Sequence, residues 1–294
     1  MLLRAGVDPD GHTVSGAPEE VFPPLVRWYV TLIRAYPSAR TVFLALLRLH
    51  EIENLKLLWR AAARERAAAV ACWRPLEPLA TIGPGLAAAT PHELVHRLSH
   101  TPYDVIARAL LRSHATDLPA TEIGLDRWAL GALRDEALRL PAREDAARRL
   151  LLSVIRERDV DLLRRGTAFG LDADLITKST VVLSRECAAE ALNAAAAWRP
   201  GAGPLWRVLP VSVVKAAGPA ATWDDVMIGL RRARLRACRR AFVGWPFQLA
   251  PALAALLLRE EQARAAISIA AARAGGSAGH AMLPLALAAS LLEG

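Results

Sequence analysis

The chain has 294 residues, a formal net charge of +8 at pH 7 and an abundance of alanine, leucine and arginine. Aromatic residues are scarce and apolar residues repeat at helical spacing along nearly the whole chain, which predicts an all-α protein. The three widely spaced cysteines include no CxxC pair, so the sequence argues against a disulfide framework and against a cysteine-based zinc site. The first residues lack the apolar core of a signal peptide, and secretion is therefore not expected.

The segment HEIENLKLLWR, residues 50–60, predicts an amphipathic helix. Apolar side chains recur on one side at three- and four-residue steps, and these are Ile52, Leu55, Leu58, Trp59 and Ala62. The other side carries polar and charged groups, which are Glu53, Asn54, Lys56 and Arg60. We expect the first side to pack in a core and the second to form a charged face.

Residues 92–96 spell HELVH, the HExxH pattern in which two histidines bind zinc and a glutamate polarises water. Thr90 and Pro91 form a good N-cap and first-turn pair, so the pattern is predicted to lie at the start of a helix. Zinc proteases carry this pattern inside a helix with uncharged neighbours, whereas Arg97 follows directly here and no third ligand has the expected spacing. A zinc-dependent hydrolase is kept as an alternative function.

Two weaker copies of the first amphipathic helix follow along the chain. In RERDVDLLRRG, Asp159 takes the place of Asn54, 105 residues later. In LLLREEQARAAISIAAARAGG, Ala265 takes the same place, another 106 residues later. Gly166 and Gly275 stand where the second and third copies are expected to end. The nearly equal offsets predict a protein built from three similar units.

Residues 231–240 contain six arginines, the densest basic cluster of the chain. They spread around a helix and have no interleaved aromatic residues to stack on bases, which favours a solvated or partner-facing surface over nucleic-acid binding. A basic helical nucleic-acid-binding protein is the second alternative. The charge-free run 241–258 is interrupted by Pro246 and Pro251, so it is too short for a membrane span and is expected to be a buried helix.

Thr101 and Tyr103 are followed by EIGLDRW at residues 122–128. This order resembles the C subunit (d in eukaryotes) of V/A-type rotary ATPases, which has a T-x-Y element, an E-x-x-L-D/E-x-x-aromatic helix and a D-x-x-N-L-x-x-x-x-R helix. The last element is matched by Glu51, Asn54, Leu55 and Arg60, and in the second copy by Asp159, Leu162 and Arg165. Phe242, Gly244 and Pro246, followed by LLLREEQARAAI, resemble the family's F-G-x-P element and leucine-rich helix. The resemblance covers most of residues 25–276.

The resemblance implies an all-α, funnel-shaped body of three similar helical units around a pseudo-threefold axis. We place these units at residues 1–90, 91–195 and 196–294, together forming one compact body. The first unit is short at its N-terminal side. The third copy departs from the family pattern, because the expected glutamate, asparagine and arginine are replaced by Gln262, Ala265 and Ile267.

The family role implies a non-catalytic central-stalk subunit, without metal or cofactor, that transmits torque between a central shaft and a membrane rotor ring during ATP-linked proton or sodium transport. The expected partners are shaft subunits and the ring, with no nucleic acid and no homo-oligomer. The expected location is peripheral, on the cytoplasmic face of the membrane, with membrane contact through the ring. The candidate protein-contact residues are Glu53, Asn54, Lys56, Arg60, Asp159 and Arg165. Ordinary packing between repeats is the alternative role for these side chains.

Overall fold

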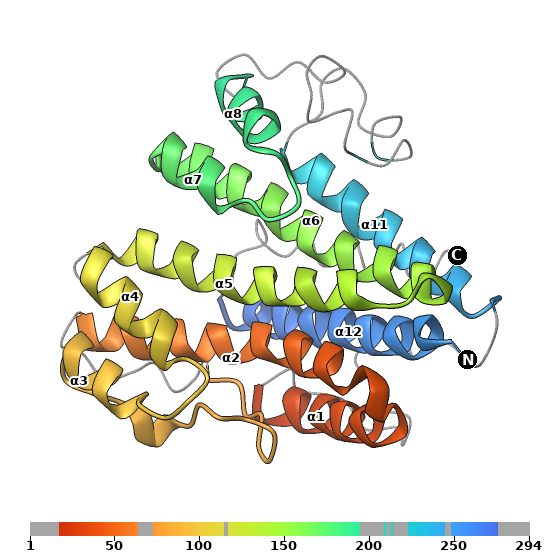
Figure 1. The fold of residues 1–294 in the computed structure, drawn as a ribbon, viewed down its shortest axis with the longest axis horizontal. Helices are drawn as coiled ribbons and strands as arrows, with labels where there is room; N and C mark the ends of the chain where they lie inside the picture. The colour runs from red at the N-terminus through yellow and green to blue at the C-terminus, as the bar shows by residue number, and fades with distance from the viewer. Residues whose placement is uncertain are drawn as a thin grey trace.

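The computed structural model shows only helices as regular secondary structure in the residues it describes (Figure 1). The described residues are 18–63, 73–114, 117–194, 209, 213, 223–244 and 248–275. This confirms the predicted all-α class. The α-helices are α1 (Pro18–Ala35), α2 (Arg40–Ala63), α3 (Pro91–Arg97), α4 (Asp104–His114), α5 (Leu118–Arg139), α6 (Asp145–Phe169), α7 (Ala173–Ser179), α8 (Arg185–Ala194), α11 (Trp223–Ala241) and α12 (Leu249–Gly275).

Side-chain caps explain where several helices begin. Thr90 accepts a hydrogen bond from the backbone N–H of Glu93 at the start of α3, as the sequence predicts. Asp117 and Asp172 cap α5 and α7 in the same way, each accepting from the N–H three residues ahead. Each cap satisfies a donor that a helix N-terminus otherwise leaves unpaired, so the short polar residues between apolar runs set the helix starts.

The second repeat helix, α6, ends later than the sequence predicts. Gly166 lies inside the helix, which continues to Phe169 and stops at Gly170, whose positive φ of 61° suits glycine. The reason for glycine at 166 is close packing, because a Cβ there would lie 2.2 Å from Cδ1 of Ile176 on α7. The prediction that Gly166 ends the helix is therefore wrong.

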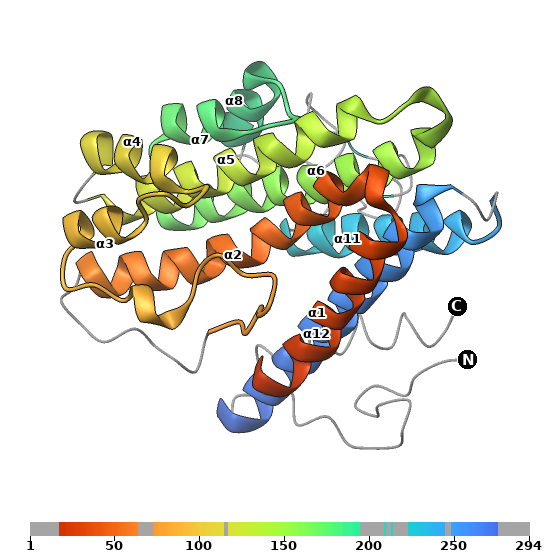
Figure 2. The same ribbon diagram turned by 60° about the horizontal axis from the view of Figure 1, so that its bottom comes forward.

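Each of the three repeat helices is the second member of a pair of successive α-helices that pack together. The pairs are α1 with α2, α5 with α6, and α11 with α12, and their helices contact one another. Figures 1 and 2 show the three connecting turns at the same end of the long axis of the molecule. In Figure 2, α1 and α12 also lie side by side. The pseudo-threefold funnel stays a prediction.

The main hydrophobic core joins residues from all three units that the sequence predicts. Tyr29, Leu133 and Leu253, from α1, α5 and α12, all belong to it and are almost completely buried. A second cluster packs α6, α7, α8 and α11 together, and a third packs α2 to α5. The helices therefore pack across the boundaries at 90 and 195.

The apolar run at 241–258 does not form one buried helix, so that prediction is wrong. Helix α11 ends at Ala241, exposed turn residues follow at 242–244, and buried α12 begins only at Leu249. Within the described residues, no single helix is both long and apolar enough to cross a membrane. Helices α1 and α2 are long and apolar enough only when taken together, and the chain bends by 114° between them.

Candidate functional site

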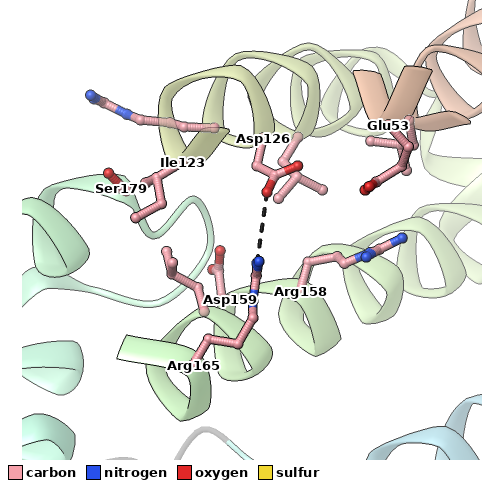
Figure 3. A pocket seen from close by; sticks show the side chains of 11 residues that line it. Glu53, Ile123, Asp126, Arg158, Asp159, Arg165 and Ser179 are labelled. Carbon is pink, nitrogen blue, oxygen red and sulfur yellow. Dashed lines mark ion pairs between the residues drawn. The ribbon is translucent and has the colours of Figure 1, made fainter. Parts of the chain in front are cut away.

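Charged side chains from several helices gather around a cleft between α2, α5 and α6. Figure 3 shows Glu53 of α2 and Asp126 of α5 facing Arg158 and Arg165 of α6. The cleft has a cavity volume of about 20 Å³, which is room for roughly one water molecule. Such a space is too small for an organic substrate. The site therefore consists of the charged groups themselves.

Arg234 of α11 is buried, with 3 % of its surface exposed. Its Nε lies 2.9 Å from Oε2 of Glu157 on α6, and its Nη2 lies 2.8 Å from Oε2 of Glu261 on α12. Burial alone raises the pKa of Glu157, but the charges of Arg234, Arg264 and Arg231 outweigh burial and lower it to about 2. Arg234 thus holds three helices together through two carboxylate side chains.

A second buried group centres on His50 of α2, whose Nε2 lies 3.1 Å from Oε1 of Glu260 on α12. The hydroxyl of Tyr29 donates to the same Glu260 oxygen, and Arg74 Nη1 donates to His50 Nδ1 over 3.0 Å. These partners assign a neutral imidazole with its proton on Nε2. Burial lowers the pKa of His50, in agreement with that assignment. Helices α1, α2 and α12 are therefore joined by one polar cluster.

Asn54 of α2 and Asp159 of α6 use their side chains to hold backbone segments that come about 20 residues later in the chain. Asn54 Nδ2 donates to the Arg74 carbonyl over 2.8 Å, and its Oδ1 accepts from the Arg74 N–H over 2.9 Å. The carboxylate of Asp159 accepts from the backbone N–H groups of residues 181–183 at 2.8–3.0 Å. Burial raises the pKa of Asp159 despite these bonds. The two positions that the repeat aligns therefore perform the same task.

Known protein families include one whose sequence model matches most of this chain. The family described as ATP synthase (C/AC39) subunit matches residues 25–281. The chain belongs to that family. The C/AC39 family consists of accessory, membrane-peripheral subunits of V/A-type rotary ATP synthase complexes, not of catalytic subunits. Among curated proteins, no individual sequence matches the chain.

In this C/AC39 chain, the predicted contact residues fall into a buried group and a partly exposed group. Asn54 and Asp159 are buried, and Lys56 is buried with its Nζ 2.6 Å from Asp126 Oδ1. The partly exposed residues are Glu53, Arg60 and Arg165. All six have partners within the chain, as packing between repeats requires, and their contact with another subunit stays a prediction.

Pairs across helices bring three of these side chains, Lys56, Arg60 and Arg165, to one face of α5. Arg60 Nη2 lies 2.7 Å from Glu122 Oε2, and Arg165 Nη2 lies 3.7 Å from Asp126 Oδ2. Burial alone raises the pKa of Glu53, but the cations Lys56, Arg74 and Arg158 lower it to about 2. Thus α5 supplies the acids that connect the first and second repeat helices, a pairing that the sequence analysis did not foresee.

The sequence pattern also gave no prediction for the buried polar residues that organise the site. Glu157, Glu260 and Glu261 are buried, although charged groups are seldom fully buried without partners. One signal for the last two was their place directly after the apolar run of α12. Arg158 was missed as well, and within the described residues its side chain has neither an ion pair nor a hydrogen bond.

The arginines of α11 do not all lie on a solvated or partner-facing surface, contrary to the sequence interpretation. Arg234 is buried, and Arg231 Nε lies 3.2 Å from Glu157 Oε1, whereas Arg232, Arg236 and Arg240 are exposed. The physical reason is that α11 packs against both α6 and α12, so only part of its circumference faces solvent. Part of the basic cluster is therefore internal, which weakens the case for nucleic-acid binding along this helix.

The HExxH pattern occupies α3, a seven-residue helix at the surface. Glu93 accepts from the backbone N–H of Ala89 and pairs with Arg97, so its carboxylate serves the helix start. Within the described residues, no group of three or more histidine, cysteine, aspartate or glutamate side chains is arranged to hold a metal ion. Cys187 and Cys238 are buried, and Cys72 lies outside the described residues.

Proposed function

We propose that this chain is the non-catalytic central-stalk subunit of a V/A-type ATPase, coupling rotation of the central shaft to the membrane rotor ring on the cytoplasmic side. The observation that carries this proposal is the buried ionic bracing between helices. Arg234 joins α6, α11 and α12, while Lys56 joins α2 to α5. Together these pairs connect helices that lie far apart along the chain.

Such bracing suits a part that transmits torque. A coupling subunit has to rotate as one body, because internal shear between its helices dissipates the rotation. Buried ion pairs with several hydrogen bonds permit only a narrow range of helix positions, since moving one partner leaves a charge unpaired in a poorly solvated place.

For the contacts with other subunits, the partly exposed charges Glu53, Arg60 and Arg165 are the groups that an adjoining subunit can reach. The buried residues Asn54, Lys56 and Asp159 position the segments that carry them. A partner that presents both carboxylates and cations matches this mixed set of charges. We assign the shaft subunits and the ring as the two partners, and we assign the subunit neither nucleic acid nor a second copy of itself.

The decisive experiment is the isolation of the complex from gently solubilised native membranes. The expected result is co-purification of this chain with shaft and ring subunits. Recovery of the complete, coupled complex without the chain would overturn the proposal.

A variant sharpens this test. Replacing Arg60 and Arg165 together by glutamate is expected to reduce ATP-driven ion transport severalfold while ATP hydrolysis continues, because the coupling joint is weakened. The matched control is Arg185→Glu, which changes an exposed arginine of α8 that has no ion pair within the described residues. Equal loss of transport in both variants would contradict the role of the two arginines.

A further inference from the structure

The three helix-pair turns form one continuous end of the molecule. We define this hairpin end by the described residues 34–41, 136–145, 240–244 and 248–249, which lie at the turns of α1–α2, α5–α6 and α11–α12. Figures 1 and 2 agree in placing the three turns at the same end of the long axis. Thr41 Oγ1 donates to Glu136 Oε2 over 2.5 Å, and the Leu249 N–H donates to Glu144 Oε2 over 2.9 Å. These bonds join the first turn to the second and the second to the third.

Each turn presents exposed arginine side chains that have no acidic partner among the described residues. These are Arg34 and Arg40 at the first turn, Arg143 at the second and Arg240 at the third. The acids of the hairpin end are already in use. Glu136 pairs with Arg139, and Asp145 pairs with Arg149. The four arginines therefore add uncompensated positive charge to one end of the molecule.

The same end also exposes apolar side chains. Of the four large hydrophobic residues that are exposed in the described part of the chain, three lie there: Leu138, Phe242 and Val243. Val243 is 89 % exposed at the turn after α11. A turn that needed only to be solvated would gain nothing from such residues. Their position among unpaired arginines gives the hairpin end an amphipathic surface.

The opposite end, where α3 and α4 lie, differs in its charges. There Arg97 pairs with Glu93, and Arg108 pairs with Asp104. Val105 is the fourth exposed hydrophobic residue, and it stands without a cluster of unpaired cations beside it. The basic, apolar surface is therefore a property of the hairpin end and not of the whole molecule.

We propose that the hairpin end is a lipid-contacting surface that binds the phosphate headgroups of anionic phospholipids at the membrane. The guanidinium groups would pair with headgroup phosphates, for which their planar donor geometry is suited. Phe242 and Val243 would enter the boundary between headgroups and acyl chains, as apolar residues of peripheral membrane proteins do. This inference rests on the proposed function and adds direct lipid contact to it, with the hairpin end facing the ring and its surrounding membrane.

Lipid fits this surface better than a nucleic acid does. Nucleic-acid sites combine cations with aromatic side chains that stack on bases, whereas two of the three exposed apolar residues are aliphatic. At a membrane surface, phosphate headgroups lie directly above the apolar interior. The arginines can contact the headgroups while the aliphatic side chains reach the apolar interior.

The test is sedimentation of the full-length chain with vesicles of phosphatidylcholine, alone or mixed with phosphatidylglycerol. We expect binding that depends on phosphatidylglycerol and weakens in high salt. Replacing Arg34, Arg40, Arg143 and Arg240 by glutamine should lower vesicle binding by a factor on the order of several hundred, since each arginine near an anionic surface contributes about a fivefold gain and the four gains multiply. Val243→Ser should lower binding by a further factor of about three.

The matched control neutralises four exposed arginines away from the turns, Arg27, Arg112, Arg127 and Arg185. Unchanged far-ultraviolet circular dichroism and thermal unfolding would show that both quadruple variants are folded. Equal binding to neutral vesicles, equal loss in both variants, or tighter binding to duplex DNA than to anionic vesicles would each overturn the proposal. Co-purification with shaft and ring subunits uses other contacts, so it can succeed even where lipid binding fails.

Discussion

The charged junction, formed by Arg234 with Glu157 and Glu261, differs from helix α3. The more conspicuous sequence pattern lies in α3, whereas the buried charges lie in the junction. Helix α3 carries an HExxH pattern, yet Glu93 only caps the helix and pairs with a neighbouring arginine at the surface. Arg234 belongs to an ordinary run of arginines, yet it is buried between two carboxylates from other helices. The contribution of a charged side chain to the free energy of unfolding depends on its burial and its partners more than on the sequence pattern around it.

The largest expected effect lies in the junction, at Arg234. Arg234→Met keeps most of the side-chain volume but leaves Glu157 and Glu261 buried without their shared counter-charge. The free energy of unfolding should fall by about 3–5 kcal/mol, measured by urea denaturation. Arg236→Met, on the exposed side of the same helix, should change it by less than about 0.5 kcal/mol. Similar losses in both variants would remove the contrast between buried and exposed charges.

The stability of the fold should depend on pH because of the same ion pairs. The pKa of Glu157 is about 2 in the folded chain, against an ordinary value of 4.5, so its ionised form stabilises the fold above the ordinary value. That contribution, on the order of 3 kcal/mol, should be lost as the pH falls from about 5 to about 2. The measurement is urea unfolding across this range. A Glu157→Gln variant with the same pH dependence as the parent chain would contradict the assignment.

A smaller effect should come from the loop-holding residues. Asp159→Ala removes the acceptor of three backbone N–H groups and should cost about 2–3 kcal/mol, while Asp159→Asn keeps one acceptor oxygen and should cost about half as much. Asn54→Ala should cost about 1–2 kcal/mol, because it leaves the N–H and carbonyl of Arg74 without their partner. Thermal unfolding measures all three. Unchanged stability in the variants at both positions would contradict their shared role in holding backbone segments.

The smallest effect is expected in α3. Thr90→Ala removes the N-cap and should lower stability by about 1 kcal/mol. A metal chelator should leave the thermal midpoint of the parent chain unchanged, because Glu93 already serves the helix start. Stoichiometric zinc in the purified chain, together with a lower midpoint after chelation, would restore the hydrolase alternative and reverse the comparison between the two regions.

The sequence predicted one side of the repeat helix correctly and its other side only in part. Leu55, Leu58 and Trp59 are fully buried, as their helical spacing indicates. Asn54 and Lys56 are also buried, although they were expected on a charged face. A helical wheel separates apolar from polar sides, but it does not show whether other chain segments cover the polar side. In α2, the segment containing Arg74 and helix α5 cover it.

The sequence by itself determined the all-α class, the positions of the long repeat helices and the family. These depend on local information, because the spacing of apolar residues, the caps and the order of motifs can be read within a few turns of helix. Only the tertiary structure decided which charges are internal. Arg234 meets Glu157 across 77 residues, and His50 meets Glu260 across 210 residues. Such partners are chosen by the packing of whole helices, whose geometry no local pattern contains.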